Sequence, residues 1–126
     1  MPQVTLHHVH HEAADVDIAA SFYVDNFEAH ITERVEREGV QWARVSIGGS
    51  MLNITDREHA QATQGPHRGL DHIGIHTTDF DATVATLRRN GVVFYVEPFS
   101  PRPGAQIAFV TGPDNVKVEV LCLTPA

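Results

Sequence analysis

Hydrophobic and polar residues alternate in several runs along the chain. In each half, one segment instead has its hydrophobic residues at helical spacing. Apolar side chains at every second position predict a strand, and apolar side chains three or four positions apart predict a helix. The first half therefore predicts a β-α-β-β-β order, in which Asp15 or Asp17 caps the helix. Its elements are expected at Val4–His11, Ile18–Asn26, Ile31–Arg37, Val40–Ile47 and Met51–Thr55.

The second half repeats the same order of patterns. Asp79 is expected to cap its helix, and the pair Asn90-Gly91 is expected to end it in a left-handed turn. The segment Pro98–Gly104 contains three prolines and is expected to have no regular structure. The elements are expected at Leu70–Thr77, Ala82–Asn90, Val92–Glu97, Gln106–Thr111 and Val116–Leu123.

These patterns predict an α+β fold of two tandem βαβββ modules, with a curved mixed sheet around a cleft. The 126 residues are expected to form one domain. Module one spans about residues 4–56 and module two about residues 69–124, joined by a polar linker at 57–68.

Composition excludes several classes of protein. The net charge is −7 with no cluster of Lys or Arg, which argues against nucleic-acid binding. No apolar stretch approaches the roughly 20 residues that cross a bilayer, and the start Met1-Pro2-Gln3 lacks the core of a signal peptide. We therefore expect a cytoplasmic protein. The single cysteine, Cys122, cannot form an internal disulfide and is expected to be a buried, inert thiol.

A histidine recurs at the same place in each half. His8 precedes Val9 and His72 precedes Ile73, each in a strand-like run, and the two histidines are 64 residues apart. If the modules pair with approximate two-fold symmetry, both imidazoles face one cavity, which is the beginning of a metal site.

A carboxylate in the last predicted strand completes this pattern. Val118 and Val120 share one face, so Glu119 lies on the other, where a carboxylate among aliphatic residues needs a partner such as a metal ion. Asn53 occupies the matching position of the first half. His8, His72, Glu119 and Asn53 therefore form the predicted ligand set for a divalent metal ion in the cleft, which is Fe, Mn, Co, Ni or Zn. Two roles remain open for Asn53, which either ligates the metal or hydrogen-bonds a metal-bound water.

With these residues the chain resembles the vicinal oxygen chelate superfamily, which includes glyoxalase I, methylmalonyl-CoA epimerase, fosfomycin-resistance transferases and extradiol dioxygenases. The resemblance spans about Val4 to Leu123. It rests on the two histidines, on Ser21-Phe22-Tyr23, and on the ending Gly112-Pro113-Asp114-Asn115-Val116-Lys117-Val118-Glu119-Val120, which is similar to the turn and strand that carry the family's metal-binding Glu.

The resemblance implies an isomerase, epimerase or lyase that stabilises an enediolate of a small oxygenated substrate. Glu119 is then a metal ligand and candidate base, and His10, on the face of His8, is a candidate proton relay. The amide at Asn53 and the stretch from Pro101 to Phe109 resemble the epimerase, whereas glyoxalase I usually has a second Glu at the position of Asn53. The alternatives are Fe(II)-dependent extradiol ring cleavage and a metal-free binding or resistance protein.

Other residues have two interpretations. Glu12 extends the face of His10 and is expected at its rim; Arg102 either clamps an anionic substrate or is a solvated loop residue. Trp42 and Phe109 line the cleft or belong to the core.

Halves of about 60 residues leave sheet edges and helix faces that need cover, so we expect a homodimer.

Overall fold

The computed structural model of the chain describes residues 3, 6–57 and 70–124. Its elements belong to two compact units that divide between residues 60 and 61. Each unit is a four-stranded mixed sheet with one α-helix, so the predicted pair of βαβββ modules and the α+β class are confirmed. The predicted linker lies outside the described residues except for residue 57, and the exact module boundaries stay a prediction.

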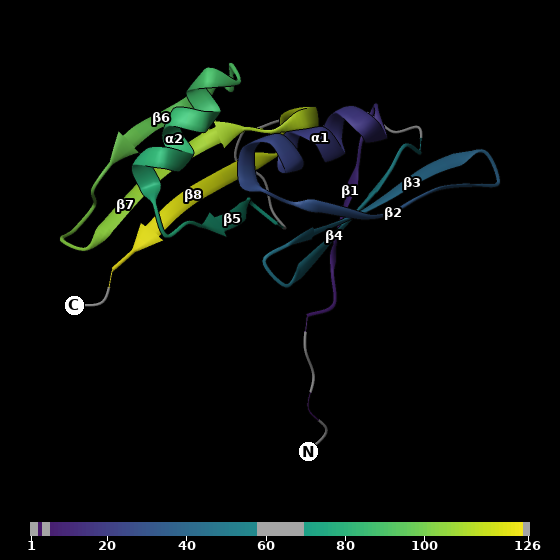
Figure 1. Ribbon diagram of the computed structural model, residues 1–126, viewed down its shortest axis with the longest axis horizontal. Helices are drawn as coiled ribbons and strands as arrows, with labels where there is room; N and C mark the ends of the chain where they lie inside the picture. The colour runs from purple at the N-terminus through teal and green to yellow at the C-terminus, as the bar shows by residue number, and fades with distance from the viewer. Residues whose placement is uncertain (1–2, 4–5, 58–69, 125–126) are drawn as a thin grey trace. The chain divides into compact units, whose positions relative to one another are not determined.

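Unit 1 contains the elements up to residue 57 (Figure 1). Its strands lie in the order β1-β4-β3-β2, with β1 parallel to β4 and the other pairs antiparallel. The elements are β1 (Val9–Glu12), α1 (Val16–Phe27), β2 (His30–Arg37), β3 (Val40–Ile47) and β4 (Ser50–Thr55).

Helix α1 covers one face of this sheet. Asp15 is the residue that caps it, because its side chain accepts a hydrogen bond from the amide N of Ile18 at 3.0 Å. Asp17 instead pairs with Arg34 of β2 at 2.8 Å, which fastens the first turn of the helix to the sheet. The hydrogen bond and charge of Arg34 hold the pKa of the Asp17 carboxyl below its usual range. The core beneath the helix is formed by Ala19, Ala20, Tyr23, Ala43, Val45, Leu52 and Ile54.

Unit 2 has the same plan, with strand order β5-β8-β7-β6 and β5 parallel to β8. Asp79 caps its helix, and Gly91 adopts the left-handed conformation (φ 71°) after the helix ends, as predicted. The elements are β5 (Ile73–His76), α2 (Phe80–Arg89), β6 (Phe94–Phe99), β7 (Ala105–Thr111), a 3₁₀ turn (Pro113–Asn115) and β8 (Lys117–Leu123). The buried residues include Leu87, Ala108, Val110, Val118 and Val120.

The structure differs from prediction at three strands. β1 and β5 begin at Val9 and Ile73, so His8 and His72 each immediately precede a strand and do not lie within it. β6 continues through Pro98, where no regular structure was expected. β6 is an edge strand with irregular register, and a strand at a sheet edge tolerates a residue without an N–H group.

Two predictions from composition concern the chain as a whole. Cys122 is a free thiol, and it is buried as predicted. Within the described ranges, no helix has the length and apolar character needed to cross a membrane.

Candidate functional site

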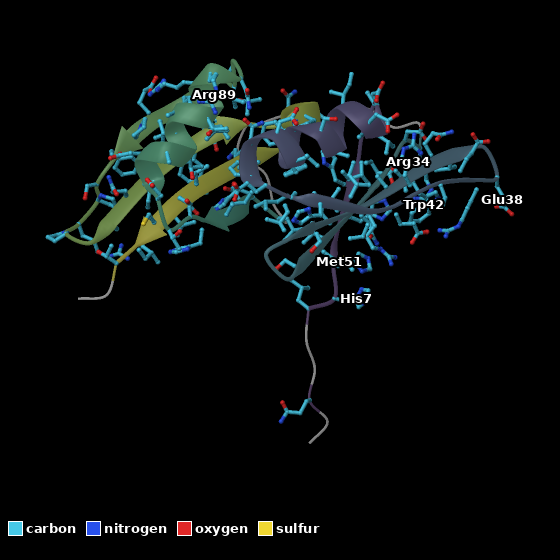
Figure 2. The ribbon with its side chains drawn as sticks, in the orientation of Figure 1. His7, Arg34, Glu38, Trp42, Met51 and Arg89 are labelled. Carbon is cyan, nitrogen blue, oxygen red and sulfur yellow. The ribbon has the colours of Figure 1, made fainter. Side chains whose placement is uncertain are left out.

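The alternation of side chains gives each sheet two chemically different faces. In unit 1, Ala43 and Val45 of β3 are buried on the side of α1, so Arg44 between them points to the opposite side. We call that opposite side the open face. Figure 2 shows Arg34 on the α1 side of the sheet and Trp42 on the open face.

Register brings the predicted residues into one row on each sheet. In unit 1, His10 pairs with Asn53 and Asn53 with Arg44. In unit 2, Gly74 pairs with Glu119 and Glu119 with Phe109. Asn53 and Glu119 therefore occupy equivalent positions, as their spacing predicted.

His8 and His72 also occupy equivalent positions. His8 lies two residues before His10, which pairs with Asn53, and His72 lies two residues before Gly74, which pairs with Glu119. The two modules thus place a histidine and an amide or carboxylate at matching points of matching strand pairs.

His72 and Glu119 lie within bonding distance of each other in unit 2. His72 Nε2 is 3.0 Å from Glu119 Oε1, and His72 Nδ1 is 2.8 Å from Asp71 Oδ2. The Lys117 ammonium donates to the other oxygen of Asp71 at 3.2 Å. The hydrogen bond from His72, followed by that from Lys117, holds the pKa of the Asp71 carboxyl below its ordinary value. Glu119 is partly buried, with a side chain 18% exposed.

This arrangement fits a divalent metal ion. Metal-binding histidines characteristically donate their second ring N–H to a carboxylate, and Asp71 provides that partner for His72. Two ligand atoms at right angles, each about 2.1 Å from an ion, lie about 3.0 Å apart, which matches the distance from Nε2 to Oε1. Within the described part of either unit, no three His, Cys, Asp or Glu side chains gather as a complete site. Unit 2 therefore offers a pair of donors.

The predicted ligands of unit 1 have different surroundings. His8 is exposed, and its Nδ1 lies 2.8 Å from Nδ1 of His7. Asn53 is buried, and its Oδ1 accepts a hydrogen bond from Arg44 Nε at 3.1 Å. The metal-binding roles of His8 and Asn53 stay predictions.

His10 belongs to a polar network on the open face. Its Nε2 lies 2.7 Å from Thr55 Oγ1 and 2.8 Å from Glu12 Oε1. Thr55, which is fully buried, also donates to Glu12, and Arg57 Nη1 donates to Glu12 at 3.0 Å. Glu12 is thus a member of the network, where the sequence placed it at the rim.

The charge state of Glu12 follows from this network. Burial raises the pKa of the Glu12 carboxyl and is the largest single effect. Hydrogen bonds from Thr55 and Arg57, with the charges of His10 and Arg57, together outweigh burial and lower the pKa below its usual value. Sequence reasoning missed Thr55 and Arg57. A signal for Thr55 was present in the sequence. Glu12 lies two residues after His10 and Thr55 lies two residues after Asn53, so the pairing of His10 with Asn53 also places Thr55 opposite Glu12.

Aromatic rings lie beside the His10 network of unit 1 and beside the His72–Glu119 pair of unit 2. These rings, Trp42, Phe109 and Tyr95, are all partly exposed. Trp42 is flanked by the guanidinium carbons of Arg57 and Arg37, at 5.3 and 5.7 Å from its ring centroid. In unit 2 the Phe109 ring centroid is 5.3 Å from that of His72 and 5.6 Å from that of Tyr95. Burial, and after it the charges of Asp71 and Glu119, raise the pKa of the Tyr95 hydroxyl. Arg102 is exposed, which agrees with a solvated loop residue.

Comparison with known proteins identifies relatives at the level of family and fold. The family model described as the Glyoxalase/Bleomycin resistance protein/Dioxygenase superfamily matches residues 5–120. No curated protein matches the chain.

Solved structures share the fold at low sequence identity. A glyoxylase/bleomycin resistance protein/dioxygenase domain from Frankia sp. EAN1pec is 19% identical, with a TM-score of 0.82 over 99% of this chain and 96% of that one. A glyoxalase family protein from Bacillus cereus is 15% identical, with a TM-score of 0.87 over 99% and 97% of the two chains. Glyoxalase I from Zea mays is 20% identical, with a TM-score of 0.77 over 90% of this chain and 43% of its own.

The lowered pKa of Glu12 predicts how stability depends on pH. Because the folded state prefers the carboxylate, Glu12 contributes stability above the unfolded pKa of 4.5, and that contribution is lost as the pH falls through the lower folded value. Glu12→Gln should therefore destabilise the protein at pH 7 and have a much smaller effect at pH 3. Urea unfolding of both proteins across this range measures the difference.

Glu38→Gln is the matched control, because Glu38 lies in the exposed turn between β2 and β3. It should change stability little at either pH. An effect of Glu12→Gln that is constant with pH would contradict the preference for the carboxylate.

Proposed function

Because the chain belongs to the glyoxalase/bleomycin resistance protein/dioxygenase superfamily, we propose that it is a divalent-metal-dependent isomerase, epimerase or lyase. Its substrate would be a small oxygenated molecule. The observation that carries the proposal is the Asp71–His72–Glu119 arrangement, in which a carboxylate orients an imidazole whose other nitrogen lies 3.0 Å from a second carboxylate.

In this proposal His72 Nε2 and Glu119 Oε1 hold the metal, and His8 is the ligand predicted from unit 1. Asn53 is left out of the ligand set, because its Oδ1 already accepts from Arg44. When bound, the ion would supply Lewis-acid chemistry by withdrawing electron density from substrate oxygens.

The side chains have separate tasks in proton transfer. Asp71 holds the orientation of the His72 ring through Nδ1. Glu119, flanked by Phe109 and Gly74 in register, is the candidate base for a proton next to a carbonyl group. His10 is the candidate proton relay, with Nε2 held by Thr55 and Glu12 so that Nδ1 is the nitrogen left for exchange.

Extradiol ring cleavage is the second candidate function, and one observation favours it. Phe109 lies next to His72 and Tyr95 lies next to Phe109, and this pair of aromatic rings suits a substrate that itself contains a ring. Two histidines and one carboxylate are also the ligands of Fe(II) oxygenases.

Metal content tests the proposed site directly. The wild-type protein should bind one divalent ion per chain, whereas His72→Ala and Glu119→Gln should lose it. Asp71→Asn should weaken binding by about tenfold or more, because it removes only the residue that orients His72. Elemental analysis and competition with a chelator give these values.

His30→Ala is the control, because His30 is exposed at the start of β2. It should retain the ion. Negligible metal in the wild type and all variants would remove the proposal and favour a metal-free binding protein, whose ligand affinity a chelator would not change.

Two assays then separate the candidate reactions. An isomerase, epimerase or lyase should exchange a substrate hydrogen next to a carbonyl for deuterium in D₂O, and NMR detects the exchange. A ring-cleaving enzyme loaded anaerobically with Fe(II) should consume O₂ when catechols are added. Exchange without O₂ uptake supports the first function, and O₂ uptake without exchange supports the second.

We also propose that the protein is a homodimer. Large apolar side chains are exposed on unit 1 at Ile18 and Ile31 and on unit 2 at Val93, and a symmetric partner would cover such surfaces. Light scattering over a hundredfold dilution should give twice the mass of one chain, and the mass of a single chain throughout would contradict the dimer.

Mixing His8→Ala and Glu119→Ala chains tests whether two chains share a metal site, because regained metal binding requires ligands from two chains.

A further inference from the structure

Equivalent positions of the two sheets carry opposite chemistry. In unit 2, Glu119 lies beside the imidazole of His72, which is a pair of donors suited to a cation. In unit 1, the matching Asn53 lies beside the guanidinium of Arg44. A neutral amide has replaced the carboxylate, and a permanent positive charge lies next to it. The row that carries donors for a cation in unit 2 therefore carries donors for an anion in unit 1.

The hydrogen bond between Arg44 and Asn53 determines which atoms remain for a ligand. Oδ1 is the amide atom that could ligate a metal, and it accepts from Arg44 Nε at 3.1 Å. A metal ion at that oxygen would lie next to the guanidinium charge, which repels it. The amide NH₂ group of Asn53 points away from this bond and is a donor.

Arg44 has unused donors of its own. Its terminal nitrogens make no hydrogen bond to any residue in the described part of the chain, and the nearest carboxylate oxygen, Glu33 Oε2, is 3.8 Å from Nη1. Glu33 already accepts from Arg37 at 2.7 Å. The Arg44 side chain is 38% exposed, on the open face. A guanidinium held at Nε, with its terminal nitrogens open, is suited to bind a carboxylate with two hydrogen bonds.

We propose that Arg44 and Asn53 form a binding site for a small carboxylate on the open face of unit 1. Arg44 supplies the charge and the paired donors, and the Asn53 NH₂ group adds a third donor from the adjacent strand. The site is built from unit 1 alone, so it goes beyond the proposed function and does not depend on the metal site of unit 2. It also assigns Asn53 to carboxylate binding, where the sequence left its role open.

Binding of lactate to chelator-treated, metal-free protein tests the site without any reaction. Lactate should shift the Asn53 side-chain amide signals and the Trp42 indole signal in NMR titrations, and methyl lactate, which lacks the charge, should not. Arg44→Gln should weaken lactate binding by roughly tenfold or more, as expected for losing a charged hydrogen-bond partner, and Arg44→Lys should recover part of it. Arg88→Gln is the control, because Arg88 pairs with Glu97 in unit 2.

Equal lactate affinity in the wild type and Arg44→Gln would overturn the proposal, as would an absence of binding to the wild type. Asn53→Ala should lose lactate affinity but retain metal. Asn53→Asp, which preserves the side-chain shape, should weaken lactate binding through charge repulsion. If Asn53→Ala loses metal to the same extent as His72→Ala, Asn53 is a metal ligand and its assigned role is wrong. If no variant or wild type binds metal but Arg44→Gln still loses lactate, the proposed function fails and the carboxylate site stands.

Discussion

The parallel pairing of the first strand of each unit with its last strand is the constraint on which both clusters depend. β1 pairs with β4 and β5 pairs with β8, and each first strand is only four residues long. Because side chains alternate between faces, a slip of one residue in either pair would turn Asn53 or Glu119 toward the helix. The fully buried Ile54 and Val120, which follow those residues, oppose such a slip since it would expose them. Packing under the helices therefore fixes the chemistry on the other face.

The two modules share this scaffold but differ at the positions around it. Gly74 of β5 stands where β1 has His10, and a Cβ at Gly74 would lie 3.7 Å from Glu119 Oε1. The missing side chain leaves space beside Glu119, whereas the corresponding position of unit 1 holds His10, whose Nε2 lies near Thr55 and Glu12. Phe109 opposite Glu119 is replaced by Arg44 opposite Asn53. Differences at a few positions on one face thus give the two rows opposite charge on the same order of strands.

The sequence predicted much of this arrangement because strand alternation is a local property. The order of elements, the cap Asp79, and the equivalence of Asn53 and Glu119 all follow from spacing or from short turn signals, whereas the choice of Asp15 over Asp17 as the first cap came from the structure. The side-chain networks did not follow. Arg57 bonds Glu12 across 45 residues, which no local pattern specifies. The turn at Gly48-Gly49 sets Arg44 opposite Asn53, but the bond between their side chains depends on conformations that strand alternation does not specify. The length of β1 was also overestimated, since alternation continues before Val9 although pairing with β4 begins there.

Pro98 has a consequence for how the chain meets its neighbours. β6 is the outer strand of its sheet, and its outward backbone groups are a template on which a strand from another molecule could form. Pro98 has no backbone N–H group to donate to an added strand. The irregular register around Val96 and Phe99 also interrupts the regular strand geometry that pairing with another strand requires. Pro98 and the irregular register therefore disfavour strand addition at β6, where Phe99 is exposed. Growth into fibrils from this edge is disfavoured by the backbone itself.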